Sequence, residues 1–276
     1  MSHRPFKVFL TILFLGLWTG PLGAQENLPK LIKRIQPAVV TVIGYDANGK
    51  IIRLGSGFFI DGKDHIITNR HVISGVAKAE VKTADGARYL LKAMVSEDQQ
   101  VDLVKLVVEG LKGIHSYLLI TQTQPEVGER VVVVGSPLGL EQTVSDGMVS
   151  AIRNIPGRGE ILQISAPVSP GSSGGPVVNL KGEVIGVATF QMSRGQNLNF
   201  AIPGRRVLAL RDFPPRSITE TKAEERQNPQ PMLKQSLPPR PKLLVPPPKL
   251  QLQQPENAPA TPEPLPLSPE PLPLKP

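Results

Sequence analysis

The sequence contains no cysteine in its 276 residues. This absence excludes a disulfide framework and a lipid anchor attached to cysteine. The four histidines are scattered along the chain, so no group of side chains has the ligand spacing of a metal site. We therefore expect no metal and no other cofactor, and a fold that is stabilised by its hydrophobic core.

Aromatic residues are also scarce, at 4% of the chain. The formal net charge of +8 falls to +6 if residues 1–24 are removed, because that segment contains Arg4 and Lys7 and no acidic residue. This basic excess is mild and scattered, and no nucleic-acid-binding motif accompanies it. The pattern indicates a solvated surface, and we expect no nucleic acid as a partner.

A hydrophobic run long enough to cross a membrane is missing as well. The apolar stretch from Val8 to Trp18 is too short for the roughly 30 Å of a bilayer's hydrocarbon core. Arg4 and Lys7 precede it and Ala24 offers a small residue for cleavage, so residues 1–24 are predicted to be a signal peptide, with an uncleaved anchor as the alternative. We expect a periplasmic or secreted protein without a stable membrane span after cleavage.

Proline is abundant only at the C-terminal end, where residues 214–276 hold 19 of the 30 prolines. Proline lacks a backbone donor and fixes φ, so this segment is predicted to be an extended or disordered tail, not a second fold. Runs such as Pro246-Pro247-Pro248 could bind a partner with an aromatic-lined groove. A spacer or tether is the simpler interpretation.

Residues 25–213 are predicted to form one domain of short β-strands. Valine and isoleucine are frequent between turn signals such as Asp61-Gly62 and Lys181-Gly182. A short helix is expected at Asn27–Gln36, and Val72-Ile73-Ser74 could form a short helical piece. The predicted strands are Val39–Ile43, Gly57–Ile60, His65–Thr68, Val81–Thr83, Asp102–Val108, Arg130–Gly135, Thr143–Ile152, Ile161–Ile164, Pro176–Asn179, Gly182–Phe190 and Asn199–Ile202. Many short strands with regular turns are typical of a sandwich or a barrel.

Three residues in the order His, Asp, Ser suggest nucleophilic catalysis. Ser173 lies in the run Gly171-Ser172-Ser173-Gly174-Gly175, and a serine hydroxyl needs a base such as His71 within hydrogen-bond reach. Asp102 opens an apolar strand from which it can orient that histidine. This chain order belongs to the double β-barrel of chymotrypsin type, so we expect an all-β fold with barrels near residues 37–122 and 123–204.

The same glycine-rich run offers donors for an oxyanion, because the backbone amides of Gly171 and Ser173 can converge on one point. Other candidates for the three roles are less well placed. They are His65 and His115 as the base, Asp98 as the acid and Ser172 as the nucleophile.

The chain resembles the trypsin-like serine proteases, and most closely the bacterial HtrA/Deg type. The matching segments are Gly55–Phe58, Ile67–Val72, Asp102-Leu103, Val134–Gly139, Thr143-Val144, Gly147–Ala151, Pro170–Pro176 and Asn199–Pro203. The resemblance implies a double β-barrel endopeptidase acting on polypeptides, with His71 as base, Asp102 as its orienting acid and Ser173 as nucleophile.

The departures from that family are informative too. A proline-rich tail takes the place of the usual PDZ domain, so the resemblance gives no support to regulation by a PDZ-bound peptide. Ser172 stands where the family commonly has asparagine and digestive enzymes have aspartate. Without an acid there, we do not expect activation by a newly freed N-terminal amine.

Specificity follows from the resemblance as an expectation. Pro167 stands where enzymes that cut after Lys or Arg have an aspartate. Matching to the family places Thr189, Phe190 and Gln191 along the substrate chain, with Val168 and Ala201 near the pocket. We expect small or medium apolar residues at P1, the residue before the cleaved bond.

Two functions of different classes are compatible with these patterns. The first is an exported serine endopeptidase that works through an acyl-enzyme. The second is a catalytically silent barrel that acts as a binding module or scaffold with an interaction tail. The complete set of His71, Asp102 and Ser173 favours the enzyme, because a scaffold has no physical need for it.

Overall fold

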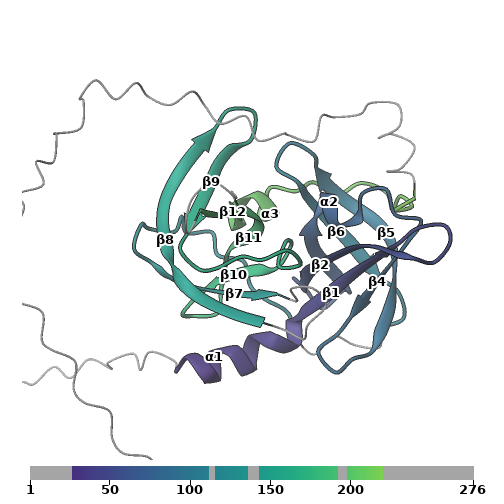
Figure 1. Cartoon of the computed structure of the whole chain (residues 1–276), viewed down its shortest axis with the longest axis horizontal. Helices are drawn as coiled ribbons and strands as arrows, with labels where there is room; N and C mark the ends of the chain where they lie inside the picture. The colour runs from purple at the N-terminus through teal and green to yellow at the C-terminus, as the bar shows by residue number, and fades with distance from the viewer. Residues whose placement is uncertain (1–26, 112–115, 136–142, 192–197, 220–276) are drawn as a thin grey trace, which may run out of the picture. The chain divides into compact units, whose positions relative to one another are not determined.

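Twelve β-strands close into two six-stranded barrels in the computed structural model, which describes residues 27–111, 116–135, 143–191 and 198–219 (Figure 1). The strands of the first barrel, in the order in which they pair, are β1 (Val39–Tyr45), β2 (Ile51–Phe59), β3 (His65–Asn69), β6 (Leu103–Val108), β5 (Arg88–Asp98) and β4 (Lys78–Lys82). Those of the second are β10 (Pro176–Asn179), β11 (Val184–Gln191), β12 (Asn199–Pro203), β9 (Gly159–Ile164), β8 (Thr143–Ile155) and β7 (Arg130–Gly135). The predicted all-β double barrel is confirmed.

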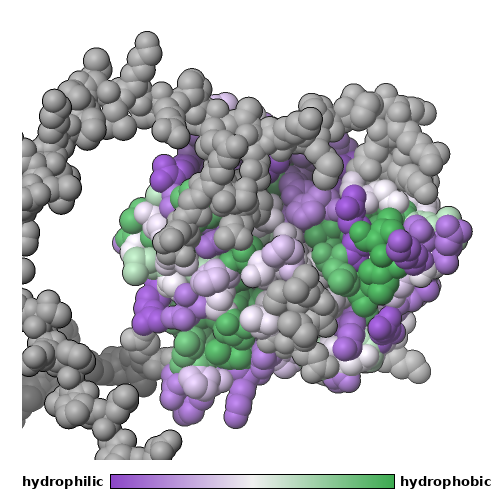
Figure 2. Space-filling view, in the orientation of Figure 1, coloured by the Kyte–Doolittle hydropathy of each residue, from purple (hydrophilic) through white to green (hydrophobic). Residues whose placement is uncertain are grey.

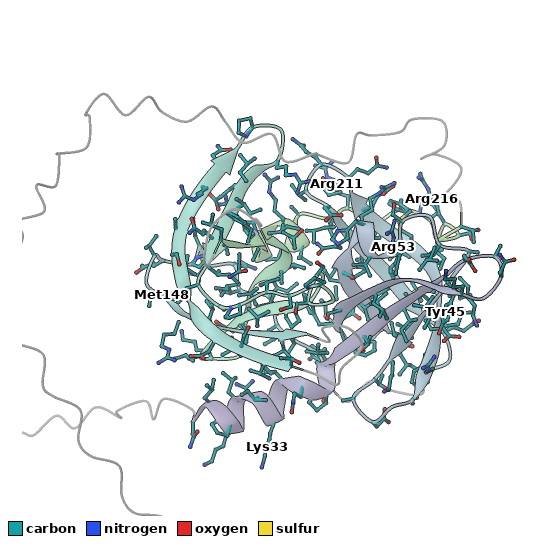
Figure 3. The ribbon with its side chains drawn as sticks, in the orientation of Figure 1. Lys33, Tyr45, Arg53, Met148, Arg211 and Arg216 are labelled. Atoms are coloured by element: carbon teal, nitrogen blue, oxygen red, sulfur yellow. The ribbon has the colours of Figure 1, made fainter. Side chains whose placement is uncertain are left out.

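Helical structure is short and lies outside the barrel walls. The pieces are α1 (Leu28–Ile35), a 3₁₀ turn η1 (Gln36–Ala38), α2 (Arg70–Ile73) and α3 (Gly204–Leu208). In α1, Leu31 and Ile35 are buried, while Lys33 points away from the barrels (Figure 3). Proline at the start of the helix and a basic last turn, Lys33 and Arg34, suit the two ends of an α-helix. No helix among the described residues is long and apolar enough to span a membrane.

Strand β5 was not among the strands expected from the sequence. Its residues 88–94, Arg-Tyr-Leu-Leu-Lys-Ala-Met, contain no β-branched side chain. Its pairing with β6 shifts register at Leu91/Ala93 and again at Met94/Ser96. Each shift breaks the alternation of buried and exposed positions by which a strand is recognised, so the local pattern is hidden.

Three apolar clusters form the core. One fills the first barrel, one fills the second, and the third lies between the barrels and includes Leu31 and Ile35 of α1. Phe58 and Val187, which come from different barrels, both belong to this third cluster. The shared core therefore fixes the position of one barrel relative to the other.

A C-terminal strap, residues 209–219, returns from the second barrel to the first. Phe213 donates its amide to Val95 O (2.8 Å), and Arg216 exchanges backbone hydrogen bonds with Met94 at 2.8 and 2.9 Å. Ile218 is 4% exposed in the core of the first barrel. Figure 3 labels Arg211 and Arg216 along this path. Ordered contacts therefore continue to Thr219, six residues into the segment that the composition predicts to be a tail.

Exposed apolar side chains gather over the first barrel, near β1 and β2 (Figure 2). Ile51, Ile52 and Leu54 of β2 are all exposed. The same strand continues through Gly55 and Ser56 toward Ser173, which Ser56 contacts through its amide.

Candidate active site

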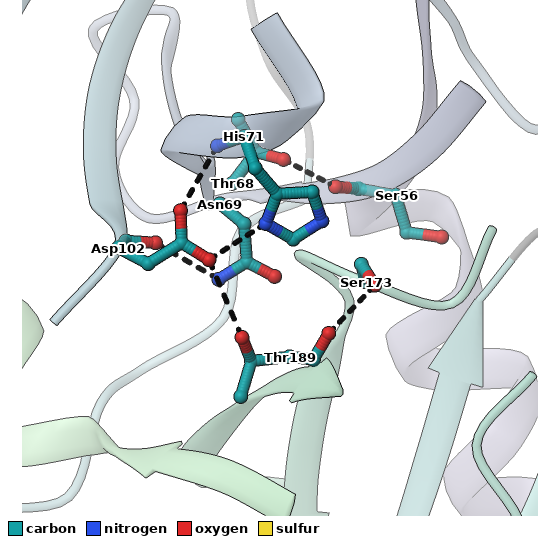
Figure 4. Close-up of polar contacts among 7 residues, drawn as sticks. All are labelled: Ser56, Thr68, Asn69, His71, Asp102, Ser173 and Thr189. Carbon is teal, nitrogen blue, oxygen red and sulfur yellow. Dashed lines mark hydrogen bonds and ion pairs between the residues drawn. The ribbon is translucent and has the colours of Figure 1, made fainter. Parts of the chain in front are cut away.

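His71 and Asp102 form a hydrogen-bonded pair at the junction of the barrels (Figure 4). His71 Nδ1 lies 2.6 Å from Asp102 Oδ2, and the His71 amide donates to Asp102 Oδ1 at 2.9 Å. The histidine side chain is 49% exposed and the aspartate 19%. Because Nδ1 faces the carboxylate, the ring presents Nε2 as the nitrogen that can accept a proton.

Asp102 is held in an unusual backbone conformation. Its φ of +69° lies in the left-handed region, which costs a non-glycine residue about 1 kcal/mol or more. Its carbonyl oxygen accepts the Arg70 amide (3.1 Å) and the side-chain amide of the fully buried Asn69 (3.0 Å). These bonds fix the turn between β5 and β6, so the carboxylate is aimed at His71.

Ser173 lies beside this pair and is linked to it through Thr189. The Ser173 hydroxyl donates to the Thr189 carbonyl oxygen (2.8 Å), and the Thr189 hydroxyl donates to Asp102 Oδ2 (3.4 Å). Among the described residues, no hydrogen bond joins Ser173 Oγ to His71. The structure therefore brings His71, Asp102 and Ser173 together, with the serine hydroxyl bonded to Thr189 O.

Thr189 makes both contacts because it lies in a β-bulge. The pairing of β11 with β12 shifts between Ala188 and Phe190, which leaves Thr189 without a partner on β12. Bulges redirect side chains next to active sites. The sequence predicts only that Thr189 flanks a substrate chain. The structure adds a hydrogen bond from its hydroxyl to Asp102.

The turn before Ser173 has two amides without an acceptor in the part of the chain that the structure describes. The Ser172 amide donates to Ser169 O (2.9 Å), which closes a turn over residues 169–172. Proline at its second position and Gly171, with φ +98°, at its third make this a type II turn. The amides of Ser172, Gly174 and Gly175 are all bonded to backbone oxygens. Within the described residues, those of Gly171 and Ser173 are not, so both remain available to an oxyanion.

Gly174 allows the nucleophile turn to lie against the first barrel. It has φ +86°, and a Cβ there would collide with Ser56 O and Thr68 Oγ1. The Ser56 amide donates to Ser173 O (2.8 Å), and its hydroxyl donates to Gly171 O (2.7 Å). These contacts fix the turn from the second barrel on β2 and β3 of the first.

The alternative candidates for base, acid and nucleophile either contact other groups or lie outside the described residues. His65 Nδ1 contacts Asp61 Oδ2 at 2.8 Å, and Asp98 accepts the amides of Gln100 and Val101. Ser172 is 7% exposed and packs against Gly135, so its hydroxyl does not face a cleft. His115 lies outside the described residues.

The structure describes the side chains of only some of the residues that are expected to bind the substrate. Val168 is 3% exposed and Ala201 is fully buried, and both belong to the core cluster of the second barrel. The Val168 amide donates to Asn199 Oδ1 (3.3 Å). The side chains of Phe190 and Gln191 lie outside what is described, although their backbones pair with Phe200 and Asn199. Within the described residues, no group of His, Asp and Glu is arranged to hold a metal ion.

Comparison with known proteins places this site in a family. Residues 55–187 match the model of the trypsin-like peptidase domain. The serine endoprotease DegS of Salmonella typhimurium is 34% identical over 188 residues, which cover 62% of this chain and 52% of DegS. A probable periplasmic serine endoprotease DegP-like of Ectopseudomonas mendocina is 38% identical over 156 residues, or 54% of this chain and 32% of that protein. The chain thus spans about half or less of these relatives.

A solved structure shares the fold. The crystal structure of the serine endoprotease from Yersinia pestis matches with a TM-score of 0.59 and 31% identity, over 66% of this chain and 64% of that one.

Proposed function

This chain belongs to the HtrA-type trypsin-like proteases, and on that premise we propose that it is an exported serine endopeptidase that uses His71, Asp102 and Ser173. The observation that carries the proposal is the His71–Asp102 hydrogen bond beside Ser173, whose turn gives the Gly171 and Ser173 amides no acceptor among the described residues. Each of the three roles in acyl transfer then has a candidate group.

The proposed reaction proceeds in two halves. Rotation of Ser173 away from Thr189 O brings its hydroxyl to His71 Nε2, which takes the proton as Oγ attacks the peptide carbonyl carbon. The Gly171 and Ser173 amides bind the resulting oxyanion, and His71 returns the proton to the leaving amine as the C–N bond breaks. Water then attacks the acyl carbon while His71 accepts its proton, and the ester C–Oγ bond breaks as His71 passes that proton to Ser173 Oγ, which releases the carboxylic acid product.

Two strand edges on either side of Ser173 support a polypeptide substrate. The backbone amide and carbonyl of Ser56 face away from β1, since they bond to Ser173 and Thr68. The direction of these groups alternates from residue to residue along a strand, so the backbone of Leu54, two residues earlier, also faces away from β1. On the other side, β11 continues through Thr189 to Gln191 beyond its pairing with β10, which ends at Val187. An extended peptide can add to such edges by backbone hydrogen bonds.

The proposed specificity is for small or medium apolar P1 residues. Pro167 offers no carboxylate to a basic side chain, and the neighbouring Val168 is apolar. Cleavage of a peptide library with Lys or Arg dominant at P1 would contradict this proposal.

Export is proposed from the residues at the N-terminus. The basic, apolar and small-residue pattern of residues 1–24 supports export. The DegP-like relatives are named as probable periplasmic proteins, which also supports it. N-terminal sequencing of the protein recovered from a periplasmic fraction tests it, and we expect residue 25 to come first. An intact residue 1 in that fraction would refute cleavage.

The test of the catalytic proposal compares Ser173→Ala with Ser172→Ala in the full chain. We expect Ser173→Ala to abolish fluorophosphonate labelling and casein cleavage, because the nucleophile is gone. Ser172→Ala should keep both, since that side chain is buried against Gly135. Equal labelling of wild type and Ser173→Ala would show that the nucleophile is assigned wrongly.

One observation favours a second function, a silent binding module. The Ser173 hydroxyl rests on Thr189 O and not on His71. If the wild type neither labels nor cleaves yet binds casein, the scaffold is the better description, and the proline-rich tail becomes its candidate partner site.

A further inference from the structure

An ion pair shielded from water lies next to the proposed catalytic histidine. Arg70 Nε is 3.0 Å from Glu97 Oε2, and the two side chains are only 15% and 11% exposed. The other Glu97 oxygen accepts Gln99 Nε2 at 3.3 Å, so both carboxylate oxygens have partners. A shielded and doubly bonded carboxylate has little rotational freedom, unlike the exposed pairs on the barrel surface.

The two members of the pair lie on the two segments that carry His71 and Asp102. Arg70 begins α2 and directly precedes His71, and its amide donates to Asp102 O at 3.1 Å. Glu97 lies near the end of β5, the strand that leads into the turn containing Asp102. The ion pair therefore joins the backbone behind the histidine to the strand that precedes the aspartate.

We propose that Arg70 and Glu97 are positioning residues that hold the His71–Asp102 hydrogen bond in its reactive geometry. This inference rests on the proposed protease function. Asp102 lies in the left-handed region and depends on contacts from residues 69–71 to remain there. Loss of the Glu97 charge removes the ion pair that ties the start of α2 to the end of β5, so the segment of His71 and the turn of Asp102 are no longer held together by this contact.

Kinetics of matched variants of the full chain test the proposal. Glu97→Gln is expected to lower kcat on casein and the rate of fluorophosphonate labelling by about 10- to 100-fold with little change in KM, as for misplaced catalytic groups. The charge-reversed double variant, Arg70→Glu with Glu97→Arg, should recover much of that loss. Asp146→Asn, which breaks the exposed Arg130–Asp146 pair of the second barrel, is the control and should match wild type.

A second readout separates this proposal from the function on which it rests. The low-field proton NMR signal of the His71 Nδ1–H···Asp102 bond should shift or vanish in Glu97→Gln and persist in Asp146→Asn. Folding is checked by the Tm of each variant. A folded Glu97→Gln with wild-type labelling and an unchanged signal would overturn the positioning role. A wild type that fails to label would overturn the protease proposal, while the NMR comparison would still decide whether the pair positions His71.

Discussion

Asp102, Thr189 and Gly174 each depart from regular strand geometry. Asp102 is left-handed, Thr189 lies in a bulge, and Gly174 combines positive φ with a crowded Cβ position. All three surround the hydroxyl of Ser173 or the carboxylate that faces His71. The strained φ of Asp102 persists only because surrounding contacts fix it, and these come from Asn69 and Arg70 of the first barrel and from Thr189 of the second.

Gly174 and Gly49 separate the effect of crowding from that of backbone conformation. Gly49 has a similar φ of +78° but no atom within 4 Å of the position that a Cβ would occupy, whereas a Cβ on Gly174 meets Ser56 O. We expect Gly49→Ala to lower the free energy of unfolding by about 1 kcal/mol. Gly174→Ala should cost clearly more and also suppress fluorophosphonate labelling, because the nucleophile turn must move.

Urea denaturation with labelling in parallel measures both effects. Equal losses of stability in the two variants, with labelling intact in Gly174→Ala, would show that the close contact of this turn with β2 has no consequence.

At the scale of the elements, the strap and β5 depend on each other. Backbone hydrogen bonds from Phe213 and Arg216 fall on Val95 and Met94, at the second register shift of β5. The same strand carries Glu97. The strap therefore forms backbone hydrogen bonds with the irregular part of β5, next to Glu97, the ion-pair partner of Arg70.

Truncation tests how far the folded domain extends. A chain that ends at Thr219 should unfold with the same free energy as the full chain. One that ends at Phe213 should lose about 2–3 kcal/mol, because Ile218 leaves the core of the first barrel. In the full chain, Ile218→Ala should cost a comparable amount.

Urea midpoints of these proteins give the measurement, with Ser217→Ala as an exposed control from the same strap. If the chain that ends at Phe213 is as stable as the full chain, the strap does not contribute to the domain.

For the whole molecule, surface carboxylates link stability to pH. The hydrogen bond from Lys78 holds the pKa of Glu80 below its ordinary value, with a further contribution from Tyr45 and despite partial burial. A lowered folded-state pKa means that the stabilisation is present above the unfolded value of about 4.3 and is lost as pH falls through the folded value. Glu80→Gln should therefore lower stability at pH 7 and have a smaller effect at pH 2–3.

Thermal unfolding from pH 2 to pH 7 tests this sign. The wild type and Glu80→Gln should converge in Tm at the acidic end. A constant difference in Tm across the whole range would mean that Glu80 acts through packing and not through its charge.

The sequence alone predicts the fold class, most strands and the chain order His71, Asp102, Ser173. The strands are local features, since β7 and β10 begin and end where turn signals and valine runs predict. Features that depend on contacts between distant segments become apparent only in the folded protein. The bulged strand β5, the left-handed Asp102, the double contact of Thr189 and the burial of Val168 and Ala201 all belong to this group. The Arg70–Glu97 pair does so too, because 27 residues separate its members and no periodic pattern connects them.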